Sequence, residues 1–89
     1  MTRPILIDFY ATWCGPCKMQ TPIIDELKMK LGDAVEIKKI DVDHHMELAG
    51  KYQIQVVPTL IIEKDDEVKY KLEGVTDAKR LEELLRPLI

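Results

Sequence analysis

The chain has 89 residues, of which 46% are hydrophobic and 33% are charged, and its formal net charge is −3. We expect a single soluble domain over positions 1–89, with a thin core. The acidic balance argues against nucleic acid as the main ligand. No apolar run approaches the roughly 18 residues of a membrane-spanning helix, and the apolar stretch near Met1 is too short for a secretory signal. These features predict a cytoplasmic protein without a membrane partner.

The first predicted element is a strand at residues 5–10, because a β-branched and aromatic run without alternation is typical of a strand buried on both faces. Asp8 places a carboxylate inside this run, where burial should raise its pKa. A helix is predicted from the cysteines that follow to residue 31. Its apolar residues recur every four positions and would form the buried face, at Met19, Ile23, Leu27 and Leu31.

The middle of the chain predicts a strand and a short helix. The second strand should cover residues 35–42, and its charged residues indicate partial exposure, at Glu36, Lys38 and Lys39. Asp43 is expected to cap a helix over residues 44–52. Met46 and Ala49 should face inward from that helix.

The last third of the chain predicts a hairpin and a helix. A third strand at residues 59–62 and a turn at residues 64–67 lead into a fourth strand. The apolar residues of the fourth strand alternate along one face, at Val68, Tyr70 and Leu72. Thr76 or Asp77 is expected to cap the last helix. The apolar face of this helix comprises Ala78, Leu81, Leu84, Leu85 and Leu88.

The resulting order, β-α-β-α-β-β-α, predicts an α/β fold with one four-stranded mixed sheet and helices on both faces. The first β-α-β unit should be parallel with a right-handed crossover, and the closing hairpin should be antiparallel. The cysteines would then lie at the carboxyl end of the first strand, where open α/β sheets place their chemistry.

Cys14 and Cys17 are the only cysteines and lie in the motif Trp-Cys-Gly-Pro-Cys-Lys at residues 13–18. With Cys14 at the start of a helix, Cys17 falls one turn later on the same face. The free N–H groups and the dipole at a helix start favour a thiolate at Cys14. Gly15 lets an incoming chain approach closely, and Pro16 suits a first turn because it lacks an N–H. This arrangement is typical of a disulfide that forms and breaks reversibly.

Two other interpretations of the cysteine pair stay open. A structural disulfide would close so small a loop that it would stabilise little. A zinc site would need two further ligands. The only candidates, His44 and His45, are sequence neighbours and are poorly placed to bind one ion together. Redox chemistry is the preferred hypothesis, and no metal is expected.

The cysteine motif and its surroundings resemble the thioredoxin family. Beyond residues 13–18, the matching segments are residues 7–11, Pro22, residues 39–43, residues 57–60 and Gly74. The resemblance runs from about Arg3 to the C-terminus. It implies a thioredoxin-like fold and a thiol–disulfide oxidoreductase, an enzyme that reduces protein disulfides through Cys14 and Cys17 with no bound cofactor.

The resemblance also implies a role for each catalytic residue. Cys14 would attack the substrate disulfide, and Cys17 would resolve the mixed disulfide that forms. Asp8 would be the buried carboxyl that exchanges a proton with Cys17. Lys39 would be the amine close to Asp8.

A substrate-binding surface is implied beside the disulfide. The peptide bond between Val57 and Pro58 would be cis, and the backbone before Pro58 would pair with an extended substrate. Trp13 would shield the site and form part of the docking surface. The implied substrate-binding set is Trp13, Gly15, Pro16, Val57, Pro58, Thr59 and Gly74.

Thioredoxins usually begin with one more strand and helix than this chain has room for, so the second strand is expected at a sheet edge. Asp66 stands where a hairpin glycine is common. Two alternatives stay open: a glutaredoxin-like reductase that uses glutathione, and a non-catalytic protein-binding module. The expected partners are disulfide-containing proteins and an electron donor of the thioredoxin-reductase type, and the chain is expected to be a monomer.

Overall fold

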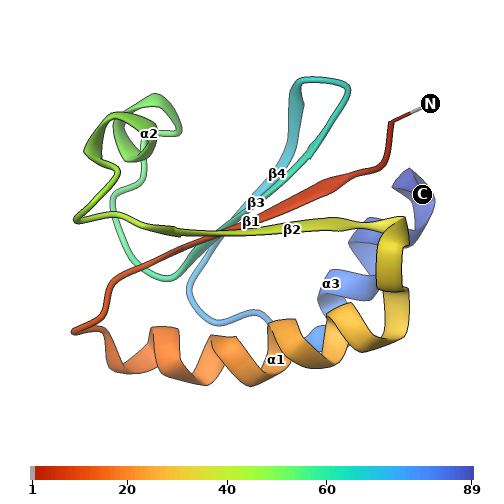
Figure 1. Cartoon of the computed structure of the whole chain (residues 1–89), viewed down its shortest axis with the longest axis horizontal. Helices are drawn as coiled ribbons and strands as arrows, with labels where there is room; N and C mark the ends of the chain where they lie inside the picture. Colours follow the sequence, from red (N-terminus) through yellow and green to blue (C-terminus); the bar gives the residue numbers. More distant parts are fainter. Residues whose placement is uncertain (1) are drawn as a thin grey trace.

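The computed structural model describes residues 2–89 and has a four-stranded sheet with helices on both faces (Figure 1). The elements follow the predicted order, β-α-β-α-β-β-α. Their bounds are β1 Ile5–Tyr10, α1 Gly15–Leu31, β2 Glu36–Asp41, α2 Met46–Lys51, β3 Thr59–Lys64, β4 Glu67–Glu73 and α3 Ala78–Leu85. Short 3₁₀ turns follow α1 at Gly32–Ala34 and α3 at Arg86–Leu88. The predicted fold class is confirmed.

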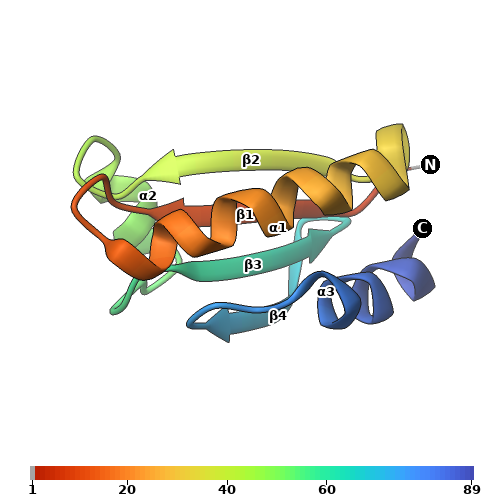
Figure 2. The ribbon, with the colours of Figure 1, turned by 90° about the horizontal axis from the view of Figure 1, so that it is seen from below.

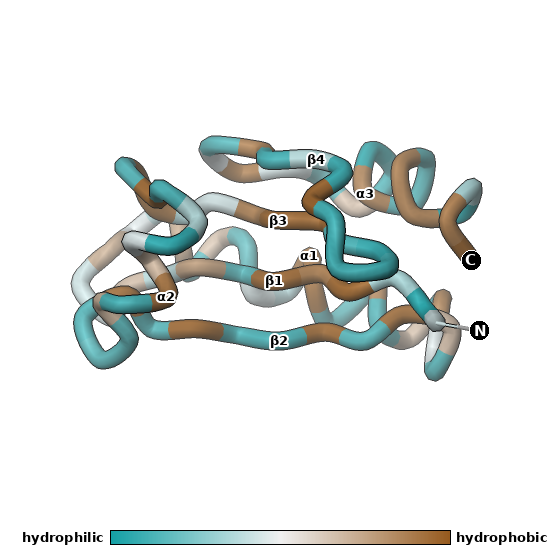
Figure 3. Tube along the Cα trace, turned by 90° about the horizontal axis from the view of Figure 1, so that it is seen from above, coloured by the Kyte–Doolittle hydropathy of each residue, from teal (hydrophilic) through white to brown (hydrophobic). Residues whose placement is uncertain are grey.

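The strands lie in the order β2-β1-β3-β4, so β1 and β3 occupy the centre of the sheet (Figure 2). β1 pairs in parallel with β2 and in antiparallel with β3, and β3 and β4 form the antiparallel hairpin. A central strand is covered by neighbours at its sides and by helices on its faces. The apolar runs of the sequence accordingly fall on β1 and β3 (Figure 3). The predicted edge position of β2 is confirmed.

Two hydrophobic clusters fill the two sides of the sheet. α1 and α3 cover one face, and α2 covers part of the other (Figure 1). The larger cluster, beneath α1 and α3, includes Leu6, Ile24, Leu27, Leu60, Ile62, Leu81 and Leu85. The smaller cluster comprises Ile7, Phe9 and Ile61. Its Phe9 ring lies 5.5 Å from the ring of Tyr52, which directly follows α2.

The buried face of α1 differs from the predicted one. Met19 is 64% exposed and Ile23 is only partly buried, so the expected spacing of four residues is wrong. The buried residues are Cys17, Gln20, Ile24, Leu27 and Leu31. Their separations alternate between three and four, because an α-helix has about 3.6 residues per turn and a strict spacing of four drifts around its axis. Gln20 therefore faces the core and Met19 faces solvent.

α2 is shorter than predicted, and Asp43 does not cap it. The N-cap is His45, whose side chain makes no capping hydrogen bond, and Met46 is exposed. Asp41 instead holds the preceding turn. Its Oδ1 accepts a hydrogen bond from the Asp43 N–H at 2.9 Å, and its Oδ2 lies 3.0 Å from Nδ1 of His44. The hydrogen bond from the Asp43 backbone lowers the pKa of Asp41. An aspartate that bonds the backbone two residues onward is a common turn-forming device, and here it replaces the cap.

A β-bulge in the hairpin changes the faces on which β4 places its side chains. Tyr70 pairs with Ile62, but Val68 pairs with Glu63, which is a register shift. Neighbouring residues of β3 point to opposite faces, so Val68 and Tyr70 do not share one face. The alternation predicted for the fourth strand is therefore wrong beyond the bulge.

The last helix agrees with its prediction except at Leu88, which lies in the 3₁₀ turn after α3 and is only partly buried. Asp77 caps α3, since its Oδ1 accepts a hydrogen bond from the Arg80 N–H at 2.8 Å. The buried residues of α3 are Ala78, Leu81, Leu84 and Leu85. Of the helices in residues 2–89, none is both long and apolar enough to cross a bilayer.

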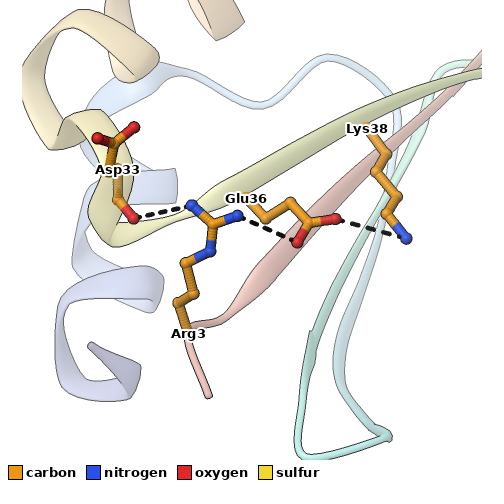
Figure 4. A network of polar contacts seen from close by, with 4 residues as sticks. All are labelled: Arg3, Asp33, Glu36 and Lys38. Carbon is orange, nitrogen blue, oxygen red and sulfur yellow. Dashed lines mark hydrogen bonds and ion pairs between the residues drawn. The ribbon is translucent and has the colours of Figure 1, made fainter. Parts of the chain in front are cut away.

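Charged side chains form a network at the start of the β2 edge (Figure 4). The Arg3 guanidinium lies 3.3 Å from the Glu36 carboxylate and donates to the Asp33 carbonyl at 3.0 Å. Lys38 Nζ lies 3.5 Å from the other carboxylate oxygen of Glu36. These pairs are exposed and each stabilises the fold only slightly. Their charges nevertheless make the edge a poor surface for pairing with another strand.

Candidate active site

The two cysteines form a disulfide at the start of α1, with their Cα atoms 5.3 Å apart. Cys14 is the N-cap residue, in an extended conformation, and its Sγ accepts a hydrogen bond from the Cys17 N–H at 3.2 Å. Pro16 lies in the first turn, where the missing N–H is no loss. Once the disulfide opens, the N–H and the positive end of the helix dipole both stabilise an anionic Cys14 sulfur.

The segment before β3 lies against Cys14. The Val57–Pro58 bond is cis, as the family resemblance implied, and the Val57 carbonyl oxygen is 3.6 Å from Cys14 Sγ. The hydroxyl of Thr59 donates to a carbonyl of the same loop at 2.6 Å. The Gly74 N–H donates to the Pro58 carbonyl at 2.9 Å. These contacts place Val57 against the disulfide and join Gly74, from a distant part of the chain, to the adjacent Pro58.

Exposure does not distinguish the two cysteines, because each is 4% exposed in the disulfide. Their surroundings differ. A hollow of about 180 Å³ lies before β3 and is lined by Trp13, Val42, Ile54, Gln55, Val56 and Val57. A second hollow, of about 270 Å³, is lined by Tyr10, Ala11, Thr12, Cys17, Lys18 and Thr21. The first is the more apolar in its lining residues and offers room for an apolar side chain of a bound polypeptide.

Trp13 stands on the surface in the loop between β1 and α1, with 70% of its side chain exposed. Its indole N–H donates to Oδ2 of Asp43 at 2.9 Å, which fixes the ring against the loop before α2. Val56 lines the same hollow and is also exposed. A fixed, exposed aromatic ring offers a large apolar contact area with a polar handle already satisfied.

Asp8 is buried in the centre of the sheet and is 2% exposed. Alternate residues of a strand share a face, and Leu6 packs beneath α1, so Asp8 points toward α1 as well. Within residues 2–89, its Oδ1 has no hydrogen-bond partner. Burial raises the pKa of Asp8 to about 6, while the charge of Lys39 opposes this rise. The predicted direction, in which desolvation outweighs the lysine, is confirmed.

The remaining polar candidates are exposed. Lys39 is opposite Asp8 in the β1–β2 register but is exposed on the edge strand, so it acts on the site through its charge. His44 and His45 are both exposed. In the part of the chain that the structure describes, no group of three or more histidine, cysteine, aspartate or glutamate side chains could hold a metal ion.

Gln20 belongs to the surroundings of the site and was not predicted from the sequence. It is fully buried, and its side-chain amide makes two hydrogen bonds to the backbone of Thr76. The available signal was its position three residues after Cys17, which places it on the face that Cys17 occupies. The predicted spacing of four residues, which begins at Met19, does not include position 20.

Comparisons with known proteins, by sequence and by structure, both find similarity to thioredoxins. A family model described as Thioredoxin matches residues 1–87. The thioredoxin of Bacillus subtilis is 47% identical over 81 residues, which are 91% of this chain and 78% of that protein. The chloroplastic thioredoxin Y of Oryza sativa is 44% identical over 79 residues, 89% of this chain. The chain spans about half of this plant relative, 47% of its length.

A solved structure shows the same likeness. The oxidised form of mitochondrial thioredoxin 3 from Saccharomyces cerevisiae matches with a TM-score of 0.88 and 34% sequence identity. The match covers 99% of this chain and 81% of the yeast chain.

Proposed function

This chain belongs to the thioredoxin family, and we propose that it reduces disulfides of protein substrates by dithiol–disulfide exchange. The observation that carries the proposal is the Cys14–Cys17 disulfide at the start of α1, with the Cys14 sulfur hydrogen-bonded to a helix N–H. A disulfide over so short a loop stabilises a fold little, so its value lies in its chemistry.

The reaction consists of two thiol–disulfide exchanges. The Cys14 thiolate attacks one sulfur of the substrate disulfide, a bond forms between the two sulfurs, and the other substrate sulfur leaves as a thiolate. The Cys17 thiolate then attacks the Cys14 sulfur and displaces the first substrate sulfur. The substrate gains two electrons and two protons in total, and Cys14 and Cys17 end as the disulfide.

Asp8 is assigned to the second exchange. Cys17 is buried and must lose its proton before it attacks, and a carboxylate that points toward α1 is suited to accept it. A pKa of about 6 lets Asp8 take up and release a proton near neutral pH. Lys39 acts by limiting the rise of that pKa.

The substrate is placed by the surface around the disulfide. An extended polypeptide pairs with the backbone at Val57, before Pro58, and packs on the ring of Trp13. Its side chain enters the apolar hollow beside Trp13. Gly15, Pro16, Thr59 and Gly74 complete the contact surface.

We also propose the partners and the setting. The oxidised protein is recharged by an electron donor of the thioredoxin-reductase type, and the reduced protein acts as a monomer in the cytoplasm. The bacterial relative is named without a compartment, and the plant relative is named as chloroplastic. The setting is tested by immunolocalisation in the source cells.

Insulin reduction, coupled to a thioredoxin reductase and NADPH, tests the proposed function. The wild-type protein should reduce insulin, and the variant with Cys14→Ser and Cys17→Ser should not. Cys17→Ser alone should accumulate a mixed disulfide with the substrate, whereas Cys14→Ser should not. Activity only with glutathione on small mixed disulfides would favour the glutaredoxin-like alternative. Partner binding that survives in the double variant, without any reductase activity in the wild type, would favour a binding module.

A further inference from the structure

A buried side-chain amide links the cysteine helix to a segment far away in the sequence. Gln20 lies on α1 one turn after Cys17 and is fully buried. Its Nε2 donates to the Thr76 carbonyl at 2.9 Å, and its Oε1 accepts from the Thr76 N–H at 2.9 Å. Both polar groups of one amide are therefore satisfied by both backbone groups of one residue.

The segment held by Gln20 reaches the disulfide. Thr76 lies two residues after Gly74, whose N–H donates to the Pro58 carbonyl at 2.9 Å. Val57, the residue before Pro58, places its carbonyl oxygen 3.6 Å from Cys14 Sγ. A continuous set of contacts thus runs from α1 through the segment 74–76 to the residues beside the reactive sulfur.

Apart from the hydrogen bond between Gly74 and Pro58, the side chains at positions 74 and 75 add little to hold the segment. Gly74 has φ +87, and a Cβ added there would meet no heavy atom within 4 Å. Val75 is exposed. A glycine followed by an exposed side chain gives a backbone with many accessible conformations. The paired hydrogen bonds of Gln20 tie this backbone to the helix of the cysteines.

We propose that Gln20 is a positioning residue for substrate binding: its amide fixes the segment 74–76 relative to the disulfide, so that Gly74 and Pro58 present a formed docking surface. This inference rests on the proposed function. It predicts that loss of the Gln20 hydrogen bonds weakens the reaction with protein disulfides and spares the reaction with small disulfides. A protein substrate uses the docking surface, whereas a small aromatic disulfide needs only the two cysteines.

The decisive variant is Gln20→Met, which keeps the length of the side chain and removes both hydrogen bonds. The reduced protein is mixed in stopped flow with increasing concentrations of a disulfide-containing protein, and separately with 5,5′-dithiobis(2-nitrobenzoic acid). For the protein substrate, the half-saturation concentration should rise about tenfold while the limiting rate stays within about twofold. The rate with the small disulfide should also change by less than about twofold. Hydrogen exchange of the Thr76 amide should become faster.

The control is Ile24→Val, which shortens a core side chain on the same buried face of α1 and removes no hydrogen bond. It should leave both substrates unaffected. Equal losses with the protein and the small disulfide in Gln20→Met, or no loss with either, would overturn the inference. If Gln20→Met does not fold, Gln20→Leu, which also lacks both hydrogen bonds and buries no charge, is judged by the same two results. A wild-type protein that does not reduce insulin would refute the proposed function and this inference with it. A wild type that does, with an unselective Gln20 variant, refutes the inference alone.

Discussion

Asp8 carries two opposing influences on one carboxyl group. Its position in a central strand removes it from water, which disfavours the charged form, and the ammonium of Lys39 favours that form. Desolvation is the larger effect, and the pKa of Asp8 rises to about 6. The folded protein therefore binds a proton at Asp8 over a pH range in which the unfolded chain has released it.

We expect Asp8→Asn to change how stability depends on pH. Well below the unfolded pKa of about 3.9 the carboxyl is neutral in both states and costs nothing. Between about pH 4 and 6 the unfolded chain ionises first, so the wild type loses stability as pH rises. Above about pH 6 the loss levels off, at on the order of 3 kcal/mol. Asparagine does not ionise, so the stability gained by the variant should grow through this window and then stay constant. Denaturant unfolding of both oxidised proteins from pH 4 to 9 measures it.

The same substitution also tests the role of Asp8 in the reaction, independently of its effect on stability. If Asp8 accepts the proton of Cys17, Asp8→Asn should slow the release of reduced substrate in single-turnover exchange near neutral pH. Unchanged release rates would remove Asp8 from the mechanism. A stability difference between the two proteins that does not depend on pH, or that grows in acid, would contradict the buried-acid interpretation.

For single residues, the sequence was informative where the chemistry depends on residues that are close together in the chain. The spacing of Cys14 and Cys17 and the isolated carboxylate of Asp8 can be recognised without a structure. Gln20 could not be, because a glutamine on a helix is most often solvated and its partner, Thr76, lies 56 residues away. Met19 was expected in the core because it is hydrophobic, but the hydrophobicity of one residue does not say which side of the helix it occupies.

The hairpin between β3 and β4 shows how an element can hold a turn that its residues do not favour. Asp65 and Asp66 connect the strands, and their φ values are +55 and +64, both in the left-handed region. Two such residues in a two-residue loop match the twist of the flanking strands, and glycine is preferred at the second position. A Cβ at Asp66 makes this conformation less favourable.

Asp66→Gly should therefore stabilise the protein by about 0.5–1 kcal/mol, since the relief of strain exceeds the added freedom of the unfolded chain. Thermal or denaturant unfolding of the oxidised protein measures the change. Asp66→Ala is the matched control. It removes the same charge but keeps a Cβ, and it should give no stabilisation. Equal gains in both variants would show that charge repulsion, and not the backbone, limits this turn.

Element boundaries depended on contacts that lie outside each element. α3 was predicted well because its cap, Asp77, and its apolar face are all within the helix. α2 was predicted less well because Asp41, from the end of β2, takes over the turn and Asp43 bonds Trp13. The bulge opposite Ile62 and Glu63 likewise depends on strand pairing, which periodicity does not report.

The whole molecule presents two sheet edges: β4 carries charged residues at Glu67, Lys69, Lys71 and Glu73, and a network of charged side chains lies at the β2 edge. Arg3, Glu36 and Lys38 lie together there (Figure 4). An edge strand has unpaired backbone groups that can pair with another chain, and charged side chains discourage this. The expected monomer follows from this feature.

A double substitution, Glu36→Val with Lys38→Val, should raise self-association. It gives the edge apolar, β-branched side chains and removes the charges that oppose pairing. Sedimentation velocity over a range of concentrations measures the effect, with Glu82→Val, remote from β2 on α3, as the control. A stable dimer of the wild type would contradict the monomer, and an unchanged monomer in the double variant would contradict the role of these charges.

The topology could be predicted from the sequence because the residue pattern of each segment indicates a strand or a helix, and because crossovers between parallel strands are right-handed. The way in which distant residues come together at the site could not be predicted from the sequence. Pro58 and Gly74 reach Cys14 only through the antiparallel pairing of β1 with β3 and of β3 with β4. Without the family resemblance, neither the cis bond before Pro58 nor its place beside the disulfide would have been expected.

A redox titration measures whether the Cys14–Cys17 pair can donate electrons to protein disulfides. The protein is equilibrated in buffers of reduced and oxidised glutathione or dithiothreitol, and the fraction of Cys14–Cys17 disulfide is measured by alkylation and mass spectrometry. We expect a midpoint near the value typical of thioredoxins, about −270 mV, so that the reduced pair is a reductant. A midpoint near about −120 mV, typical of a strong oxidant of thiols, would contradict it.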